Sequence, residues 1–324
     1  MLIILIAGLH TIKNLEPPEN RFHSKEHYGP PSECWKDYYD KPEFKTLDFA
    51  MAKYPDFAEI VKKELFKLPE LNSMVPQGIT TIDNRYIIIT AYDSRKINPS
   101  KCYVLDTEGN LLNTAILESA SHVGGIAYDR RNDLIWIPGI GDKLNAYASS
   151  DIIENESVQA KHSINLRRAN LEDKDSIDYL FLEDEYIYTG TFSKVQNGQV
   201  DRYKIENSNQ KIELSLTDTF EVPPFIQGMT IYRKEKENYL ILSSSYGRHN
   251  ASKLYTFKFD ETLKDYSDTT KCTTKTLPPM LEQITIKGSK LLVIFESNAK
   301  KYHDCRTKVE SIVALNIEKI VGKE

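Results

Sequence analysis

Five segments of the chain share one pattern, in which a small or polar residue precedes an alternating apolar run. The segments are PQGITTI, VGGIAYD, IDYLFLE, IQGMTIY and LEQITIK, anchored at Gln77, Gly124, Asp178, Gln227 and Glu282. Neighbouring anchors are 47 to 55 residues apart. Apolar residues at every second position are typical of half-buried β-strands, so each anchor predicts the start of a strand.

Two further apolar runs follow each anchor strand. The second runs are RYIIITAYD, DLIWIPGIGD, EYIYTGTF, NYLILSSSYGR and KLLVIFES, and the third are KCYVLDTEG, KLNAYASSD, QVDRYKIEN, SKLYTFKFD and ESIVALNIE. Short polar links such as DN and KGS separate the first run from the second, which is hairpin chemistry. A weaker fourth run, such as LLNTAILES, follows in most repeats.

A period of about 50 residues with three to four short strands predicts an all-β fold, a single β-propeller. The count gives five blades, and a sixth, degenerate blade in the N-terminal region stays an alternative. The last repeat ends after its third strand near Asn316, so we expect the N-terminal side to supply the missing strand. The segment ELFKLPE fits that role. The overlapping DFAEIVKKELF instead has helical spacing, with Phe57, Ile60, Val61 and Leu65 on one side.

The chain divides into three parts. Residues 1–14 form an apolar leader, 15–71 an irregular, partly helical arm that closes the ring, and 72–324 the propeller. The apolar run Leu2–Leu9 is too short to cross a bilayer but has the length of a signal-peptide core. We therefore expect a secreted or extracytoplasmic protein without a transmembrane helix, and a first strand or an apolar tail is the alternative.

Composition excludes one class of partner. The chain carries 42 Lys and Arg against 47 Asp and Glu, a formal charge of −5 with no basic block. Nucleic acid is therefore not the expected partner, because binding its phosphates needs clustered positive charge. Gly is scarce, at 14 residues, so the hairpins must turn on Asn, Asp, Ser and Pro.

The four cysteines form no CxxC pair, which argues against a zinc knuckle or a redox motif. In an exported protein an even number fits two disulfide bonds. The favoured pairs are Cys272 with Cys305, which flank the last repeat, and Cys34 with Cys102. Four buried free thiols are the alternative.

The starts of the anchor strands should converge at one end of the propeller axis. Gln77, His122, Asp178, Gln227 and Glu282 would meet there, and such convergence is the usual mark of a ligand site. Three interpretations stay open. The ring binds a polar small molecule or glycan, it holds a hard cation such as Ca²⁺ through Asp178 and Glu282, or it only orders water and fixes blade register.

Loops after the second strands add candidates at the same end, of which Tyr246, Arg248 and Glu296 are the most notable. Arg248 has the geometry for a bidentate contact with a carboxylate or phosphate. The alternative is an ion pair between Arg248 and Glu296 across two blades. No catalytic motif is present, so His122 and Glu282 are the candidates for an acid or base.

The repeats YDRRNDLIWIPGIGDKLNAY and GMTIYRKEKENYLILSSSYGRHNASKLYTF resemble blades of secreted gluconolactonase-like and YncE-like propellers, over about residues 72–317. Gluconolactonase-like enzymes hold a divalent cation with Glu, Asn and Asp in the channel. This chain has no Asn at its anchors. We expect an extracellular binding protein for a polar small molecule or glycan. The alternatives are a cation-dependent hydrolase of a lactone, ester or phosphate, and a protein-interaction scaffold.

Overall fold

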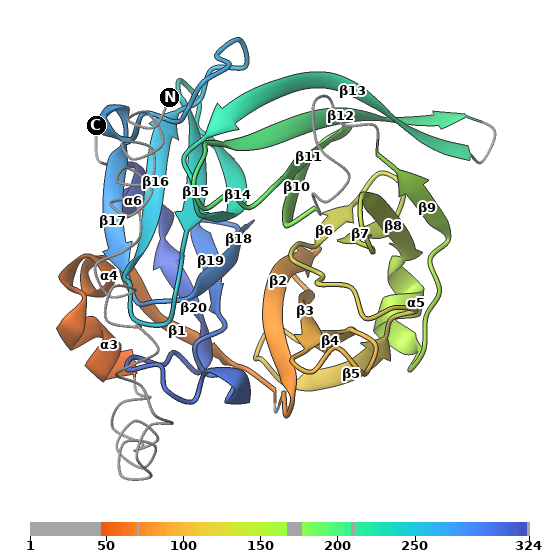
Figure 1. Cartoon of the computed structure of the whole chain (residues 1–324), viewed down its shortest axis with the longest axis horizontal. Coiled ribbons are helices and arrows are strands. Elements are labelled where there is room, and N and C mark those ends of the chain that lie inside the picture. Colours follow the sequence, from red (N-terminus) through yellow and green to blue (C-terminus); the bar gives the residue numbers. More distant parts are fainter. Residues whose placement is uncertain (1–46, 70, 167–176, 209–210, 323–324) are drawn as a thin grey trace, which may run out of the picture.

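Each sequence repeat folds into one four-stranded antiparallel sheet, and the sheets surround a common axis (Figure 1). The computed structural model describes residues 47–69, 71–166, 177–208 and 211–322. Within these ranges there are five sheets, so the protein is a five-bladed β-propeller. The predicted leader, the arm before residue 47 and Cys34 lie outside the described residues.

The blades follow one another along the chain. Blade 1 contains β2 (Met74–Ile82), β3 (Tyr86–Asp93), β4 (Lys101–Leu105) and β5 (Leu111–Ile116). Blade 2 contains β6 (Ala127–Asp129), β7 (Leu134–Pro138), β8 (Lys143–Ala148) and β9 (His162–Asn165), with α5 (Ser149–Glu154) before β9. Blade 3 contains β10 (Tyr179–Glu183), β11 (Tyr186–Gly190), β12 (Gly198–Ser208) and β13 (Lys211–Val222).

The last two blades follow the same plan. Blade 4 contains β14 (Ile226–Arg233), β15 (Asn238–Ser244), β16 (Ser252–Lys258) and β17 (Thr273–Leu277), with the 3-10 turn η3 (Thr269–Lys271) before β17. Blade 5 contains β18 (Leu281–Lys287), β19 (Lys290–Phe295), β20 (Ser311–Asn316) and β1 (Val61–Lys67). The 3-10 turn η4 (Lys300–Tyr302) and α6 (Ile317–Val321) complete it.

The ring closes with a strand from the N-terminal side, as the missing strand of the last repeat predicts. β1 pairs antiparallel with β20, with Phe66 opposite Ile312 and Lys67 opposite Ser311. β1 is the outermost strand of blade 5, so it covers the edge of β20 that would otherwise stay unpaired.

The helical interpretation of residues beyond Ile60 is wrong. The helices α3 (Leu47–Lys53) and α4 (Pro55–Ile60) precede β1, and α4 ends where the strand begins. Phe57 of α4 packs edge-on against Phe295, with ring centroids 6.1 Å apart. The apolar spacing therefore forms a helix only as far as Ile60. The residues after Ile60 are more stable as a strand, because they form backbone hydrogen bonds with the free edge of β20.

Acidic and amide residues make the hairpin turns, as the scarcity of glycine predicts. Asp83 and Asn84 join β2 to β3 with φ of 46° and 57°. Asp133 and Asp184 adopt the same left-handed region in blades 2 and 3. Asn and Asp tolerate this region better than other side chains, which explains their use in two-residue hairpins.

β-Bulges lie at the start of three inner strands. The register shifts between Pro76 and Gly78, between Ile226 and Gly228, and between Leu281 and Ile284. The anchors Gln77, Gln227 and Glu282 are the residues inside these bulges. A bulge re-aims a side chain away from the normal pleat, so the repeated anchor pattern encodes a repeated backbone irregularity at one end of the axis.

The disulfide bond predicted between Cys272 and Cys305 is absent. Cys102, Cys272 and Cys305 are all free thiols, and Cys102 and Cys305 are buried. Cys272 lies beside the core of blades 3 and 4, whereas Cys305 belongs to a cluster near blades 1 and 2. The two residues flank one repeat in sequence but pack into different parts of the ring. In the described residues no helix has the length and apolar character to cross a membrane.

Candidate ligand site at the axial mouth

Two carboxyl groups meet at the axial mouth. Glu282 comes from the bulge of β18 and Glu296 from the residue after β19. Their residues are only 2% and 9% exposed, and the two carboxyl groups are hydrogen-bonded to each other. Burial, followed by repulsion from Glu296, raises the pKa of Glu282 well above its usual range, and burial raises the pKa of Glu296 to about 7. The pair therefore retains a proton near neutral pH.

A second layer of polar groups holds Glu296. Gln77 Nε2 donates to Glu296 Oε2 at 2.9 Å and to its neighbour Pro76 O at 2.9 Å. The Tyr302 hydroxyl also donates to Glu296 and is hydrogen-bonded to the Tyr92 hydroxyl. Burial is the main reason that the pKa of Tyr302 rises, so the Tyr302 hydroxyl keeps its proton. Blades 1 and 5 thus share one hydrogen-bonded network.

The network continues outward to basic groups. Lys301 Nζ donates to the Tyr92 hydroxyl at 2.7 Å, and the Tyr92 ring packs against His122 with centroids 4.8 Å apart. His122 reaches solvent at the opening but is surrounded by protein on its other sides. Loss of water there, with the charges of Lys301 and Lys96, lowers its pKa to about 4. The imidazole is neutral at physiological pH.

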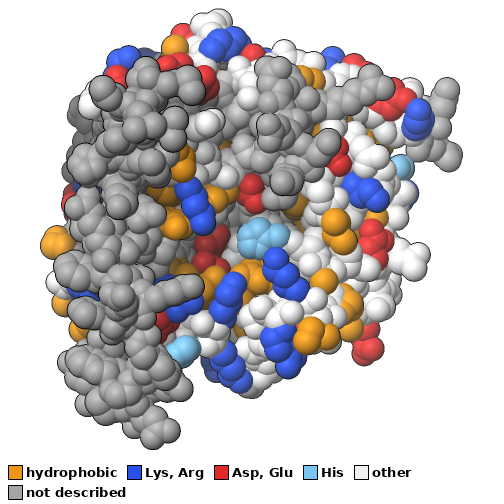
Figure 2. Space-filling model, viewed as in Figure 1, with side chains coloured by type: hydrophobic (Ala, Val, Ile, Leu, Met, Phe, Trp, Pro, Cys, Tyr) orange, Lys and Arg blue, Asp and Glu red, His pale blue; other side chains and the backbone are white. Residues whose placement is uncertain are grey.

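Figure 2 shows this end of the molecule. Acidic groups and a histidine lie near the centre of the face, and several Lys and Arg side chains surround them. The mouth therefore has an acidic floor and a basic rim.

Gln283 fills the axis next to the carboxyl pair. Its Oε1 accepts the backbone N–H groups of Ile79 at 3.0 Å and Ile126 at 2.9 Å. Its Nε2 donates to Ile126 O at 2.8 Å and Leu180 O at 3.0 Å. One side chain thereby joins the inner strands of four blades. At this depth the axis is filled with protein, so the mouth is a depression and not a tunnel.

Sequence reasoning missed Gln283, although a signal was present. Its repeat position holds Gly78, Gly125 and Gly228 in blades 1, 2 and 4. A Cβ at Gly78 would lie 2.9 Å from Gln283 Oε1, and one at Gly228 would lie 2.8 Å from the Gln283 Cα. The glycines leave the space that a single long side chain then occupies. A large polar residue at an otherwise glycine position was the available clue.

Asp178 and Gln227 do not join the carboxyl pair through any hydrogen bond that the described residues show. The Asp178 carboxylate accepts the Phe192 N–H at 2.8 Å, and its backbone carbonyl packs against Gly124. Gln227 is half-buried in its bulge. Within the described ranges, no three His, Cys, Asp or Glu side chains converge as a metal site would require. Two carboxyl groups, Glu282 and Glu296, are the nearest approach to one.

Aromatic rings line the mouth beside blades 3 and 4. Phe225 and Tyr246 stack with centroids 5.1 Å apart, and Phe192 lies 6.3 Å from each. All three are half-buried, so each exposes part of its ring. Phe225 has φ of 66°, an unusual backbone for an aromatic residue, which places its ring at the start of β14.

Arg248 does not pair with Glu296, contrary to the alternative above. Its Nη1 donates to both carboxylate oxygens of Asp304, at 2.8 and 2.6 Å, and its guanidinium lies 5.3 Å from the Tyr302 ring centroid. The Cys305 thiol donates to Arg248 O at 3.0 Å. Asp304 is half-buried and lies within reach of the guanidinium, whereas Glu296 is held in the network with Gln77 and Tyr302. These contacts fasten the loop 296–310 of blade 5 to blade 4.

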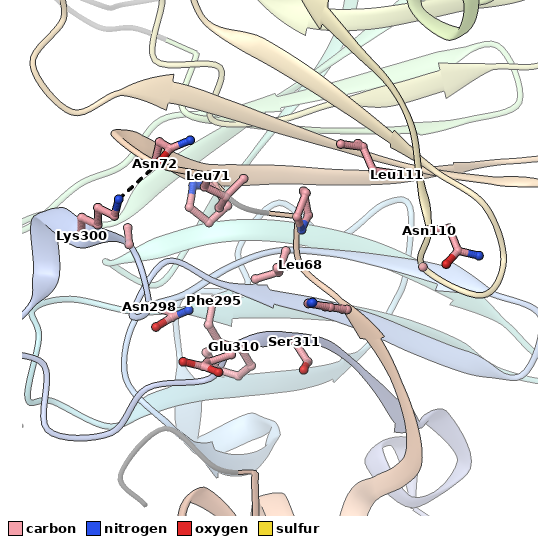
Figure 3. A pocket seen from close by; sticks show the side chains of 15 residues that line it. Leu68, Leu71, Asn72, Asn110, Leu111, Phe295, Asn298, Lys300, Glu310 and Ser311 are labelled. Carbon is pink, nitrogen blue, oxygen red and sulfur yellow. Dashed lines mark hydrogen bonds between the residues drawn. The ribbon is translucent and has the colours of Figure 1, made fainter. Parts of the chain in front are cut away.

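A cavity of about 630 Å³ lies beside the mouth, between blades 5 and 1 (Figure 3). Leu68, Leu71, Leu111 and Phe295 give it apolar walls, and Lys300 donates to Asn72 Oδ1 at its rim, at 3.4 Å. Pro76 and Phe295, which line it, are sequence neighbours of Gln77 and Glu296. The buried carboxyl groups converge at the axis, whereas the charged residues that line this cavity are Lys67, Lys300 and Glu310. The axis is therefore the better candidate for recognition of a polar ligand.

No protein-family model matches the chain, and no curated protein matches it. Among solved structures, the WD40 β-propeller domain of Doa1 is similar, with 9% identity and a TM-score of 0.40 over 74% of this chain and 84% of that one. The Dos1 propeller has 13% identity and a TM-score of 0.38 over 78% and 62%. At this level of similarity the neighbours say nothing about the ligand. The narrower resemblance to gluconolactonase-like and YncE-like proteins stays a hypothesis.

Proposed function

We propose that the axial mouth binds a polar small molecule or glycan through Glu282 and Glu296. The observation that carries this proposal is the buried carboxyl pair, in which Glu282 comes from the bulge of β18 and Glu296 from the loop after β19. Burying two carboxyl groups side by side costs free energy that packing alone would not require. Such a pair accepts hydrogen bonds from ligand hydroxyls and, while it retains a proton, donates one.

The neighbouring side chains fit a sugar-like ligand. Gln77 and the tyrosine hydroxyls hold the pair in place, and the half-exposed rings of Phe225 and Tyr246 offer a flat apolar surface. Sugars present hydroxyls at their edge and C–H groups on their faces, so one ligand would satisfy both surfaces. The proposal includes an extracytoplasmic location, which rests on the apolar run Leu2–Leu9 alone.

Thermal melting with a panel of neutral monosaccharides and short glycans tests this proposal. A ligand that binds only the folded protein raises the melting temperature. We expect at least one sugar to do so, and we expect Glu296→Gln and Gln77→Ala to weaken that sugar by about 10-fold or more. Glu310→Gln, in the same loop but outside the pair, is the matched control. A panel without any shift, or an unchanged affinity in Glu296→Gln, would contradict the proposal.

Melting temperatures measured with EDTA and with Ca²⁺ test the predicted Ca²⁺ site. They also test the hypothesis of a cation-dependent hydrolase, which requires that site. Ca²⁺ takes about six to eight oxygen ligands, and Glu282 with Glu296 supplies only two carboxyl groups. We therefore expect EDTA and Ca²⁺ to leave the melting temperature unchanged. A Ca²⁺-dependent rise that disappears in Glu282→Gln would instead establish the cation site.

A second candidate function is protein binding by the loops around the mouth, and exposed hydrophobic side chains in these loops support it. Among the residues that the structure describes, the three most exposed large hydrophobic side chains are Ile97, Ile140 and Val195, at 72%, 66% and 57%. Each lies in the loop between the second and third strands of blade 1, 2 or 3, at the mouth. The five loops of this type carry eight Lys or Arg against four Asp or Glu, although the whole chain is acidic.

Charge complementarity identifies the partner as a polypeptide surface that combines acidic and apolar residues. Binding of an acidic, leucine-containing peptide library should fall when Ile97, Ile140 and Val195 are all changed to Ser. Leu263→Ser, a change at an exposed leucine away from the mouth, should have no effect. Equal binding by the triple variant, or binding only to anionic vesicles, would contradict this second candidate.

A further inference from the structure

Basic groups converge beside the carboxyl pair. Lys301 Nζ lies 5.1 Å from the ring centroids of both Tyr92 and Tyr302, in addition to its hydrogen bond with Tyr92. The Tyr92 ring contacts His122 in turn, and Lys96 is close enough for its charge to act on the same imidazole. Lys96, Lys301 and His122 thus gather at one side of the opening.

Neither lysine forms an ion pair among the described residues, and Lys301 acts on Glu296 only through the longer-range effect of its charge. The ion pairs within 4.0 Å in the described part of the chain join other residues, for example Arg130 with Asp83 and Arg248 with Asp304. Two ammonium groups beside an imidazole repel one another and disfavour a third positive charge. A ligand anion at this place would relieve that repulsion and form charge-assisted hydrogen bonds.

The backbone that carries Lys96 is fixed in an unfavourable conformation. Lys96 has φ of 56°, in the left-handed region. The buried Asp93 carboxylate holds this turn by accepting the N–H groups of Arg95, Ile97 and Asn98. The Asn98 side chain donates to the same carboxylate, and these four hydrogen bonds hold Lys96 in one place.

The carboxyl floor does not balance these charges. Because the pair retains a proton near neutral pH, it contributes about one negative charge against the two lysines. The Asp93 carboxylate below Lys96 is offset by Arg95, whose Nε lies 3.7 Å from Asp93 Oδ1. A purely cationic ligand would therefore meet net repulsion at the opening. A neutral ligand would leave the basic groups without an anion.

We propose that the ligand of the axial mouth is an acidic sugar or a related hydroxy acid. Lys96, Lys301 and His122 bind its anionic group, and Glu282 with Glu296 bind its hydroxyls. This inference rests on the proposed function, because it assumes that the carboxyl pair contacts the ligand. It adds the charge of the ligand and the residues that select for it.

Two probes of nearly equal shape test the charge. D-glucuronate and D-glucuronamide share all hydroxyls and differ in one carboxylate or amide group. Calorimetric titration should show that glucuronate binds about 10-fold more tightly, as one charge-assisted hydrogen bond predicts. Lys96→Met and Lys301→Met should each remove most of this preference, and Lys236→Met, an equal charge change at the opposite end of the ring, should keep it. Equal affinities for acid and amide in the wild type would overturn the inference.

The imidazole provides a second readout that does not depend on the sugar. Inorganic sulfate should shift the NMR signal of His122 saturably and raise its pKa, because a bound anion favours the charged ring. The Lys96→Met, Lys301→Met double variant should lose this response. No saturable shift with sulfate or glucuronate, up to roughly 50 mM and thus well above a millimolar Kd, would overturn the inference.

The two proposals fail in different ways. If glucuronate and glucuronamide bind equally and Glu296→Gln weakens both, the mouth is the ligand site but does not select an anion. If sulfate still binds at His122 while Glu296→Gln has no effect on either sugar probe, the basic groups bind anions and the carboxyl pair is not part of the site.

Discussion

Glu296 determines much of the pH response of the molecule. Its pKa rises from an ordinary 4.5 to about 7 in the folded state because its carboxyl group is buried beside Glu282. The folded protein then binds more protons than the unfolded chain between about pH 4.5 and pH 7. The stabilising effect of this proton is complete below that window and is lost as the pH rises through it.

We therefore expect Glu296→Gln to gain stability relative to the wild type as the pH rises from 5 to 8. The shift corresponds to roughly 2–3 kcal/mol of unfolding free energy across that range. Urea unfolding at a series of pH values measures it. Because the lowered pKa of His122 gives the opposite slope, the difference between variant and wild type is the quantity to compare. A difference that does not change with pH would contradict the buried pair.

Replacement of Gln283 should strongly lower the free energy of unfolding, because this one side chain makes four hydrogen bonds to other blades. Gln283→Ala removes four hydrogen bonds and leaves the N–H groups of Ile79 and Ile126 without partners. We expect a loss of about 3–5 kcal/mol in urea unfolding, because buried unpaired backbone groups are costly. The control Gln199→Ala removes one hydrogen bond, from the half-buried Gln199 to Asp201, and should cost about 1 kcal/mol or less. Equal losses would show that Gln283 does not tie the blades together.

At the scale of elements, the fifth blade depends on two distant segments. β1 supplies Phe66, which packs with Ile79, Leu292 and other residues of blades 1 and 5. Its backbone pairs with β20, about 250 residues later in the chain. The strand therefore joins the first and last blades both through the backbone and through the core.

We expect Phe66→Ala to destabilise the protein by about 3–5 kcal/mol and to open blade 5 first. Hydrogen exchange should then show faster exchange at Ile312 and Val313 of β20 than at the equivalent residues of blade 3. Leu112→Ala, an exposed apolar change on β5, is the control and should leave exchange unchanged. Uniform loss of protection in all blades would mean that the ring opens as one unit.

The elements also show what sequence can predict. The alternating runs predict the strands, and the missing last strand predicts closure from the N-terminal side, because both follow from local period and strand count. The end of α4 at Ile60 could not be predicted, since Val61 and Leu65 continue the helical spacing and only pairing with β20 makes them a strand. Convergence of Gln77 and Glu282 near one opening followed from the repeat. The contact between Glu282 and Glu296 could not be predicted from the repeat. It depends on the conformation of one bulge and one loop of the same blade.

At the scale of the whole molecule, the ring is held by strand closure and core packing and not by covalent links between the described cysteines. Cys102 and Cys305 are buried, and Cys272 is partly exposed. Burial raises the pKa of the Cys305 thiol to about 11, which lowers its reactivity. We expect a thiol reagent to label Cys272 in the native protein well before Cys102 and Cys305, with mass mapping to identify the sites. A Cys272–Cys305 peptide from a non-reducing digest would contradict this arrangement.

The closure of blade 5 has a consequence for how the chain is made. About 240 residues separate the end of β1 from the start of β20, and a ribosome adds roughly 5–20 residues per second. β1 therefore waits some tens of seconds for its partner, while the other blades emerge and assemble. During translation, an unpaired strand edge at one end of a growing arc is open to other chains, and completion of the last blade ends that exposure.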